Sequence, residues 1–297
     1  MKARTRFIIG FLSPALLLYV GLVGLPLVQS FYLSLFNWRA TSNHKTFVGA
    51  KNLVQYASDP IMITAGKNQA LLLVCGGLMI MMFAVSIAHA LLVPSKLSKG
   101  IQAIMLFPQV VSMVVVGVIW QFMLHPRYGL LISACRYAHI PIPKDGVLGV
   151  EGWAGLAVLL AFVWQAIGFY VMLFGAGLRN IDGEVIEAAE LDGAAGWTRF
   201  RRITWPLLWS VKRVAVIYVV SNVMGTFALV QLLTNAGPDN ATQVLLTYMF
   251  KKGWEQNKMG QASAIAVYSF LIAMVLGALV WRVIGRNPEN PRRSAAI

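Results

Sequence analysis

The chain has 297 residues, of which 58% are hydrophobic and 12% are charged, and its mean hydropathy is +0.68. Soluble globular domains carry about 25% charged residues, so this composition excludes an ordinary soluble domain and indicates a protein that crosses a membrane several times. The net charge of +14 would suit a nucleic-acid partner, but the positions of the basic residues favour a membrane orientation signal instead.

Six apolar runs are long enough to cross a bilayer as helices, since a span needs about 20 mostly apolar residues. They lie approximately at residues 7–29, 66–93, 101–124, 153–178, 211–233 and 262–284. The runs lack the two-residue alternation of barrel strands, so we predict an all-α membrane protein with six transmembrane helices in a single domain over residues 1–297. The first run has no small-residue cleavage pattern, and we expect a retained span rather than a signal peptide.

The basic residues predict which side of the membrane each loop faces. With six spans the two termini share one side, and fifteen of the 25 Lys and Arg residues fall there. Short, basic loops stay in the cytoplasm, so we predict cytoplasmic termini and no nucleic-acid partner. The opposite loops also carry more bases than acids. That excess would attract an anionic partner or solute, although ordinary variation in loop composition explains it as well.

The cysteines and histidines indicate no chemistry of their own. Cys75 lies within the second span and Cys135 in an outer loop, and these different depths argue against a disulfide. The four histidines show no metal-ligand spacing, and no nucleophile and base cluster near one membrane face. We therefore predict neither a catalytic site nor a metal site in this chain.

The charged loop between the fourth and fifth spans, residues 179–210, stands out in this apolar chain. Asp182 is expected to cap a helix that begins at the next residue, and Gly193 is expected to end it where a positive φ costs nothing. A second short helix should run to about Ile203, and Pro206 should end that helix because proline lacks an N–H.

The charges of this loop are segregated, with five acids followed by five bases between Asp182 and Arg213. A loop lying on the lipid surface would place its arginines against anionic headgroups, which suits the second half. The negative inner leaflet would repel the acids of the first half, which flank a pair of alanines. That half is better suited to close docking against another protein.

The same loop closely resembles the EAA motif of the permeases of importer-type ABC transporters. The family pattern has Glu-Ala-Ala followed at fixed spacings by Gly, Ile and Pro. The matching residues here are Glu187, Ala188, Ala189, Gly193, Ile203 and Pro206, and Asp192 directly precedes the glycine. Further stretches that resemble carbohydrate-uptake permeases, of the maltose and glycerol-3-phosphate type, are Pro14–Trp38, Phe107–Leu131 and Phe227–Phe250.

The chain departs from the family pattern at two positions outside the motif. Asp182 occupies a place where the family often has proline, and Ser133 stands where asparagine is common. The large extracytoplasmic insertion of the larger maltose permease is also absent. These differences bear on local geometry only.

The resemblance implies a type I importer permease whose loop is the coupling helix, seated on an ATPase. No GxxxxGK[ST] phosphate loop occurs here, so ATP and Mg²⁺ would belong to a separate ATPase chain. The implied partners are a second homologous permease, two ATPase copies and an extracytoplasmic solute-binding protein. Glu187 would anchor the loop to the ATPase, Ala188 and Ala189 would allow close approach, and Gly193 would form the turn.

Polar side chains inside the fourth and fifth spans are candidates for a solute path, because burying them in lipid costs free energy. The cluster comprises Trp164, Gln165, Phe169, Tyr170, Ser221, Asn222, Thr226 and Gln231. The resemblance to the maltose permease places Gln165, Phe169, Asn222 and Thr226 near solute-contacting positions. Small polar residues also join helix to helix, and that interpretation stays open for each residue.

Two other classes of membrane protein fit the sequence less well. A secondary transporter would need an ionisable residue at the bilayer midplane, and no acid lies inside any of the six runs. A membrane enzyme would need a reactive cluster near one face. We therefore predict a permease subunit for a sugar or glycoside in the cytoplasmic membrane. An anionic solute such as glycerol-3-phosphate or an acidic oligosaccharide is the alternative.

Overall fold

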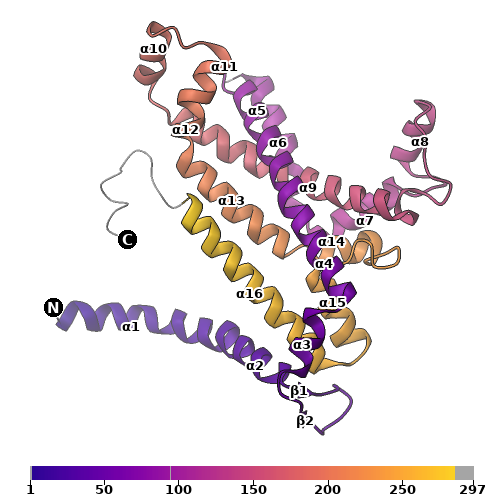
Figure 1. The fold of residues 1–297 in the computed structure, drawn as a ribbon. Coiled ribbons are helices and arrows are strands. Elements are labelled where there is room, and N and C mark those ends of the chain that lie inside the picture. The colour runs from indigo at the N-terminus through magenta and orange to yellow at the C-terminus, as the bar shows by residue number, and fades with distance from the viewer. Residues whose placement is uncertain (1, 94, 285–297) are drawn as a thin grey trace. The chain divides into compact units, whose positions relative to one another are not determined.

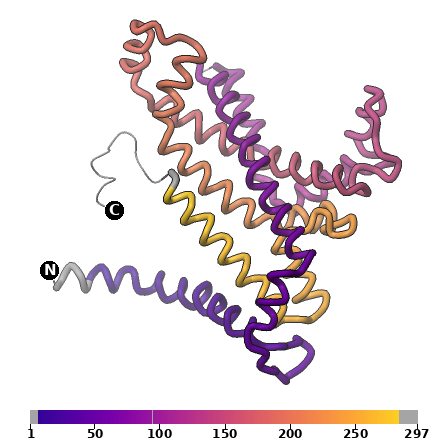
Figure 2. The backbone as a smooth tube through the Cα atoms, viewed as in Figure 1, coloured from indigo at the N-terminus to yellow at the C-terminus, as the bar shows by residue number. Residues whose placement is uncertain are grey.

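The structure is a computed structural model that describes residues 2–93 and 95–284 (Figures 1 and 2). Its internal contacts divide the chain into two compact units. The first unit holds the residues up to Ile63 together with Leu245–Leu271, and the second holds Thr64–Val244 together with the residues from Ile272 onward. Each unit is described by itself.

Within the described residues, four helical segments are long and apolar enough to cross a membrane, namely Phe7–Ser34, Pro60–Ala90, Glu151–Arg179 and Met259–Arg282. Two further candidates are bent pairs. The chain bends by 101° between α6 (Lys96–Val110) and α7 (Met113–Met123). It bends by 71° between Gly196–Leu207 and α13 (Trp209–Met224). The predicted all-helical architecture is confirmed, and the count reaches six spans if each bent pair is one span.

The first unit is built around a long apolar helix and a short hairpin. Its elements are α1 (Lys2–Tyr19), a π-helical turn (Val20–Gly24), α2 (Leu25–Ser34), the antiparallel strands β1 (Phe36–Asn37) and β2 (Thr46–Phe47), α3 (Lys51–Ala57), α15 (Leu245–Phe250), a second π-helical turn (Lys251–Glu255) and the first half of α16 (Met259–Ile284). The sequence did not predict the hairpin. Its two-residue strands are too short to show an alternating pattern.

Buried amide and hydroxyl groups hold the segment after α2 in place. The Asn52 side chain donates to the carbonyls of Ser34 and Phe36, each at 2.9 Å, where the end of α2 leaves backbone acceptors free. The Tyr268 hydroxyl of α16 donates to the Leu53 carbonyl at 2.8 Å. These bonds join α3 to the end of α2 and to α16.

Asp59 is the centre of a second polar contact in this unit. Its carboxylate accepts from the Met62 N–H at 2.9 Å, which caps α4 (Pro60–Leu71), and from the Tyr248 hydroxyl at 3.1 Å. Burial and the charge of Asp59 raise the pKa of Tyr56 to about 12, and the same two causes raise the pKa of Tyr248. Both hydroxyls therefore remain proton donors at neutral pH.

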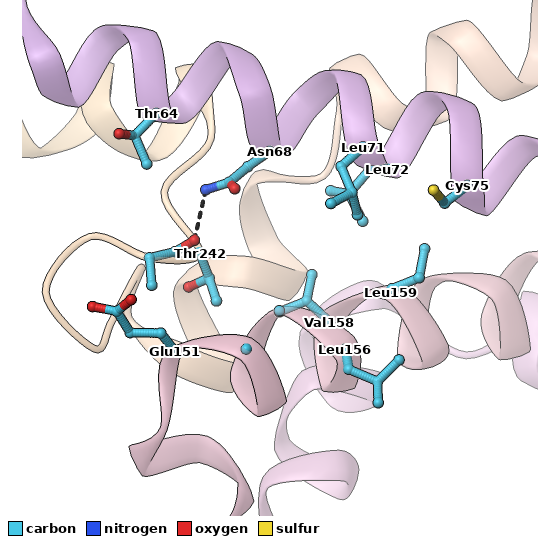
Figure 3. A pocket seen from close by; sticks show the side chains of 13 residues that line it. Thr64, Asn68, Leu71, Leu72, Cys75, Glu151, Leu156, Val158, Leu159 and Thr242 are labelled. Atoms are coloured by element: carbon cyan, nitrogen blue, oxygen red, sulfur yellow. Dashed lines mark hydrogen bonds between the residues drawn. The ribbon is translucent and has the colours of Figure 1, made fainter.

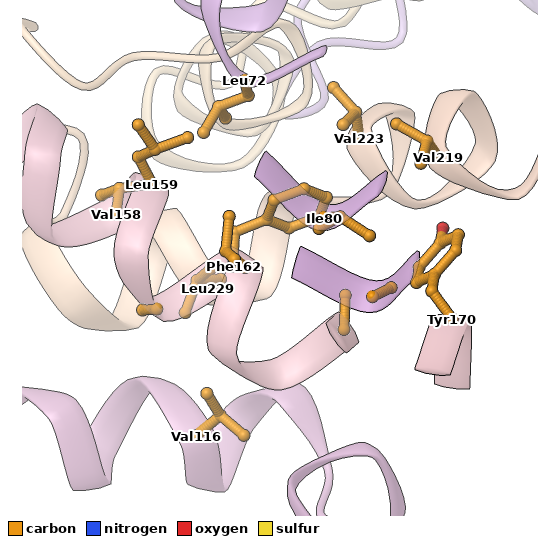
Figure 4. Packing of buried hydrophobic residues seen from close by; sticks show 14 of the residues in the cluster. Leu72, Ile80, Val116, Val158, Leu159, Phe162, Tyr170, Val219, Val223 and Leu229 are labelled. Atoms are coloured by element: carbon orange, nitrogen blue, oxygen red, sulfur yellow. The ribbon is translucent and has the colours of Figure 1, made fainter. Parts of the chain in front are cut away.

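The second unit is organised around the long helix α9 (Glu151–Arg179), which packs on α5 (Gly77–Ala90) and on α6. Its further elements are α4 from Thr64, a π-helical turn (Leu72–Gly76), α7, α8 (Leu130–Tyr137), a 3₁₀ turn (Val147–Gly149), α10 (Gly183–Leu191), α11 (Gly196–Arg199), a π-helical turn (Phe200–Thr204), α12 (Trp205–Leu207), α13, α14 (Phe227–Thr234) and the end of α16. Figure 4 shows the centre of its core, where Ile80, Phe162 and Leu229 are fully buried.

Small residues allow the helices of this core to approach closely. A Cβ on Gly168 of α9 would lie 1.9 Å from the Met105 carbonyl oxygen of α6, so only glycine fits there. A Cβ on Gly177 would lie 2.5 Å from the Val211 side chain of α13. In a membrane, where lipid tails are as apolar as the side chains, such close packing is a main source of helix association.

The third span is not the continuous helix over 101–124 that the hydropathy predicts. The chain turns at Val111 and Ser112, which both adopt extended backbone, and the Ser112 hydroxyl then accepts from the Val115 N–H at 3.4 Å to cap α7. Hydropathy does not register this break, because the apolar run continues through a serine that can serve as a helix N-cap.

The fifth span, predicted over 211–233, is also broken. The helix α13 ends at Met224, and a turn at Gly225 and Thr226 leads into α14. At the break the Val223 carbonyl accepts from the Thr226 N–H at 3.3 Å, from the Thr226 hydroxyl at 2.9 Å and from the Gln69 amide of α4. Backbone and side-chain donors together thus satisfy the carbonyl at the end of α13.

Candidate functional site

The first half of the 179–210 loop is a short helix with a defined start and end. The Asp182 carboxylate accepts from the Glu184 N–H at 3.2 Å and caps α10, which confirms the predicted start. Gly193 follows the helix with φ of +77°, and the N–H groups of Gly193 and Ala194 bond back to the carbonyls of Glu190 and Ala189 at 3.0 and 2.9 Å. This pair of bonds is a Schellman motif, which confirms the predicted glycine turn.

The second half of the loop differs from the prediction at Pro206. The helical backbone does not end there but runs from Gly196 to Leu207, and the chain bends at Leu208. A π-helical turn precedes the proline, with the Trp205 N–H bonded to the Phe200 carbonyl five residues earlier. The wider turn accommodates a proline ring that an α-helix would reject, because π-type bonding changes the carbonyl that faces the ring.

An ion pair and a row of aromatic rings connect the parts of this loop. Arg199 of α11 pairs with Glu190 of α10, so the acidic and basic halves meet across the turn. The ring of Phe200 stacks on Trp197 at 5.3 Å and contacts Trp205 at 5.9 Å. These contacts fix α10 and α11 relative to each other and pack α11 on the residues that follow it.

The structure divides the motif residues between an outer and an inner face. Glu187, Ala188, Asp192 and Gly193 are exposed, whereas Ala189 is only 5% exposed and faces inward. Of the two alanines predicted to form the approach surface, only Ala188 is therefore exposed in this structure. The exposed face also presents Leu191, which is 90% exposed.

The base of the loop is fixed to the helix that follows. The Lys212 ammonium of α13 donates to the Trp205 carbonyl at 2.7 Å and lies 4.5 Å from the centre of the Trp205 ring. One residue on, the Arg213 guanidinium lies 4.4 Å from the Trp281 ring at the end of α16. Of the two remaining motif residues, Ile203 is half-buried and Pro206 is exposed. A displacement of the loop is thus passed to α13.

Among the solute-path candidates Gln165, Phe169, Tyr170, Asn222 and Thr226, which are five of the eight, three lie together between α9 and α13. The Asn222 amide donates to the Tyr170 hydroxyl at 3.3 Å, and the Phe169 ring lies 5.3 Å from the Tyr170 ring. Tyr218 joins them, with its ring 5.0 Å from that of Phe169. Sequence reasoning missed Tyr218, although it precedes Asn222 by four residues and so shares its helix face.

The other two candidates occupy different surroundings. Gln165 is buried on α9, one turn before Phe169. Thr226 is fully buried, and its hydroxyl bonds to the backbone of the turn after α13, as a helix-packing role requires. Thr226 does not contact the group formed by Phe169, Tyr170, Tyr218 and Asn222 through any hydrogen bond recorded among the described residues.

A cavity of about 540 Å³ lies between α4, the first turns of α9 and the turn at Ala241 and Thr242 (Figure 3). The Asn68 amide points across it and donates to the carbonyls of Ala241 and Gln243 at 2.7 and 2.9 Å. Sequence reasoning missed Asn68 and its neighbour Gln69. The signal was present, because adjacent amides inside an apolar span need partners of their own.

These features define a helical membrane protein with a rigid charged loop between two spans and a polar group in its core. The family of binding-protein-dependent transport system inner membrane components matches residues 80–287, and the chain belongs to this family. Residues of both candidate sites fall within the matched range.

Individual relatives cover almost the whole chain. The diacetylchitobiose uptake system permease protein NgcF of Streptomyces coelicolor is 32% identical over 98% of this chain and 87% of its own length. The sn-glycerol-3-phosphate transport system permease protein UgpA of Brucella suis is 29% identical over 93% of this chain and 94% of its own. A chain of a bacterial ABC transporter that imports the acidic polysaccharide alginate shares the fold, with a TM-score of 0.76 at 20% identity and coverage of 95% and 97%.

The turn at Gly193 yields a prediction about loop rigidity. Valine at a φ of +77° costs about 1–2 kcal/mol, so Gly193→Val should speed amide hydrogen exchange over residues 183–194 by about tenfold while the protein still inserts into the membrane. Gly183→Ala is the matched control, because a Cβ there meets open space. Equal exchange in Gly193→Val and in the original protein would show that the turn does not set the rigidity of the loop.

Proposed function

We propose that the chain is one of two permease subunits of an ATP-driven importer that carries a sugar or glycoside into the cell. The observation that carries the proposal is the loop of residues 179–210, a capped and cross-linked pair of helices with Glu187 and Ala188 exposed. It is supported by membership of the binding-protein-dependent family. The chain acts in transport and has no ATPase role of its own.

The proposed assembly places this chain beside a second homologous permease. Two copies of a cytoplasmic ATPase bind ATP and Mg²⁺, and an extracytoplasmic binding protein delivers the solute. Both termini and the 179–210 loop face the cytoplasm, as the distribution of basic residues favours. Glu187 is the polar anchor to the ATPase, and Ala188 allows the two surfaces to approach.

The mechanism follows from how the loop is attached. Closure of the ATPase pair on nucleotide displaces α10, and the Schellman turn and the Glu190–Arg199 pair pass that motion to α11. The contacts of Lys212 with Trp205 then pass it to α13. Because α13 carries Tyr218 and Asn222, the same motion moves one wall of the solute path relative to α9. Nucleotide that binds one conformation of the ATPase pair more tightly than the other thereby shifts the transporter between its two conformations.

The uncharged group of Phe169, Tyr170, Tyr218 and Asn222 favours a neutral hydroxylated solute. Aromatic faces pack on sugar rings, and amide and hydroxyl groups bond to sugar hydroxyls. The name of the relative NgcF, which concerns diacetylchitobiose, supports the same class. The second candidate is an anionic solute, favoured by the basic excess of the outer loops and by the glycerol-3-phosphate named for UgpA.

The solute path is tested by side-chain removal. Asn222→Ala should raise the solute concentration needed for half-maximal uptake by about fivefold, since a hydrogen bond contributes about 1 kcal/mol, and Gln165→Ala should act in the same direction. Ser30→Ala is the control, because that hydroxyl lies on α2, outside the solute-path cluster, and bonds to its own helix at the Pro26 carbonyl. Uptake by Asn222→Ala that matches the Ser30→Ala control would remove Asn222 from the path.

The proposed function itself is tested by reconstitution of the chain with its partner permease, ATPase and loaded binding protein. Uptake should require ATP on the ATPase side, and Glu187→Lys should abolish both uptake and co-purification of the ATPase, because it reverses the charge of the anchor. Glu255→Lys is the control, an equal reversal at an exposed residue outside the loop that should leave ATPase binding intact. Solute flux through the chain without the ATPase would refute the proposal.

A further inference from the structure

A second cavity, of about 350 Å³, lies between the end of α5 and the second half of the 179–210 loop. Figure 1 shows α11 beside this end of α5. From α5 the cavity is lined by Ser86 and His89, and from the loop by Trp197, Arg199 and Phe200. The proposed coupling role uses Arg199 only through its ion pair with Glu190 and assigns no occupant to this cavity.

The lining of this cavity is amphipathic. Arg199 makes it cationic, and the exposed Arg201 and Arg202 follow in the sequence. Trp197 and Phe200, whose rings stack at 5.3 Å, give it an apolar part. Among the described residues that line it there is no acid, although Glu190 pairs with Arg199 from outside the lining. An occupant that fits has an anionic head and an apolar body.

The position of the cavity favours a lipid as its occupant. The apolar helix α5 ends at Ala90 and the next helix begins at Lys96, so the cavity lies where a span leaves the hydrocarbon region. Trp197 is 73% exposed there, as is common for tryptophan at a membrane interface. Basic pockets between spans at this depth bind the headgroups of anionic lipids.

We propose that this cavity binds an anionic phospholipid, with the headgroup phosphate on Arg199 and His89 and the start of an acyl chain along Trp197 and Phe200. Arg199 is 26% exposed on its side chain and is already paired with Glu190. The phosphate therefore competes with the Glu190 carboxylate for the same guanidinium. Lipid occupancy in this way loosens the link between α10 and α11.

The test measures lipid retained by the full-length chain in native mass spectrometry, so it needs no ATPase and its outcome is separate from that of the proposed function. The chain is purified from vesicles of phosphatidylcholine with and without phosphatidylglycerol. We expect retention of phosphatidylglycerol over phosphatidylcholine, with a loss of about tenfold in Arg199→Gln, since a charge-assisted phosphate contact is removed. Lys99→Gln is the matched control, an exposed lysine outside the cavity.

Glu190→Gln separates the phosphate contact from the shape of the loop. It breaks the same ion pair but leaves the cation free, so it should retain at least as much phosphatidylglycerol as the original chain. A loss in Glu190→Gln equal to that in Arg199→Gln would assign the effect to loop folding and overturn the proposal. An equal loss in Lys99→Gln would show bulk charge attraction, and displacement of the lipid by millimolar inorganic phosphate would show a free-anion site. Each of these results refutes the lipid site.

Discussion

Every backbone N–H and C=O inside a bilayer must find a partner within the protein, and this constraint determines where the helices of this chain can break. The chain breaks inside two predicted spans, and in each case a side chain contributes a hydrogen bond at the break. Ser112 caps the helix that restarts after the first break. At the second break the Gln69 amide and the Thr226 hydroxyl donate to the Val223 carbonyl, which also accepts from the Thr226 N–H. The breaks are therefore stable features that bring polar groups into the core.

The same constraint explains why the polar group at the α9–α13 contact can serve transport. Asn222 lies half-buried just before the second break, with its amide bonded to Tyr170 of α9. The loop at the other end of α13 is held by Lys212 and by the ion pair between Glu190 and Arg199. α13 thus connects the exposed loop to the polar group that it shares with α9, so in the proposed mechanism a displacement of the loop moves that group.

Features set by local chemistry were predictable from the sequence. The Asp182 cap and the positive φ at Gly193 follow from rules that concern a few neighbouring residues, and the structure has both. Hydropathy likewise located the apolar helices, because burial in lipid leaves a compositional signal over about 20 residues. The EAA motif from Glu187 to Pro206 could be recognised because this sequence keeps the spacings of the family pattern.

Features that depend on packing or on an unusual turn were not predictable. The continuation of the helix through Pro206 depends on a π-helical turn, and the inward face of Ala189 depends on how the loop folds back. The amide of Asn68 finds its partners more than 170 residues away, at Ala241 and Gln243. An amide in an apolar span indicates that a partner is needed, but the sequence does not indicate which residues supply it.

The central claim is that the loop moves as a rigid lever together with α13. It is tested most directly by the distance between spin labels at Gly183→Cys, where a Cβ meets open space, and at the exposed Ile217→Cys of α13, in the assembled transporter after both native cysteines have been replaced by serine. Rigid coupling predicts the same distance without nucleotide and with ATP trapped, while a label on the ATPase moves relative to α9. A change in the 183–217 distance on ATP binding would show that the loop deforms instead of transmitting force, and would refute rigid coupling.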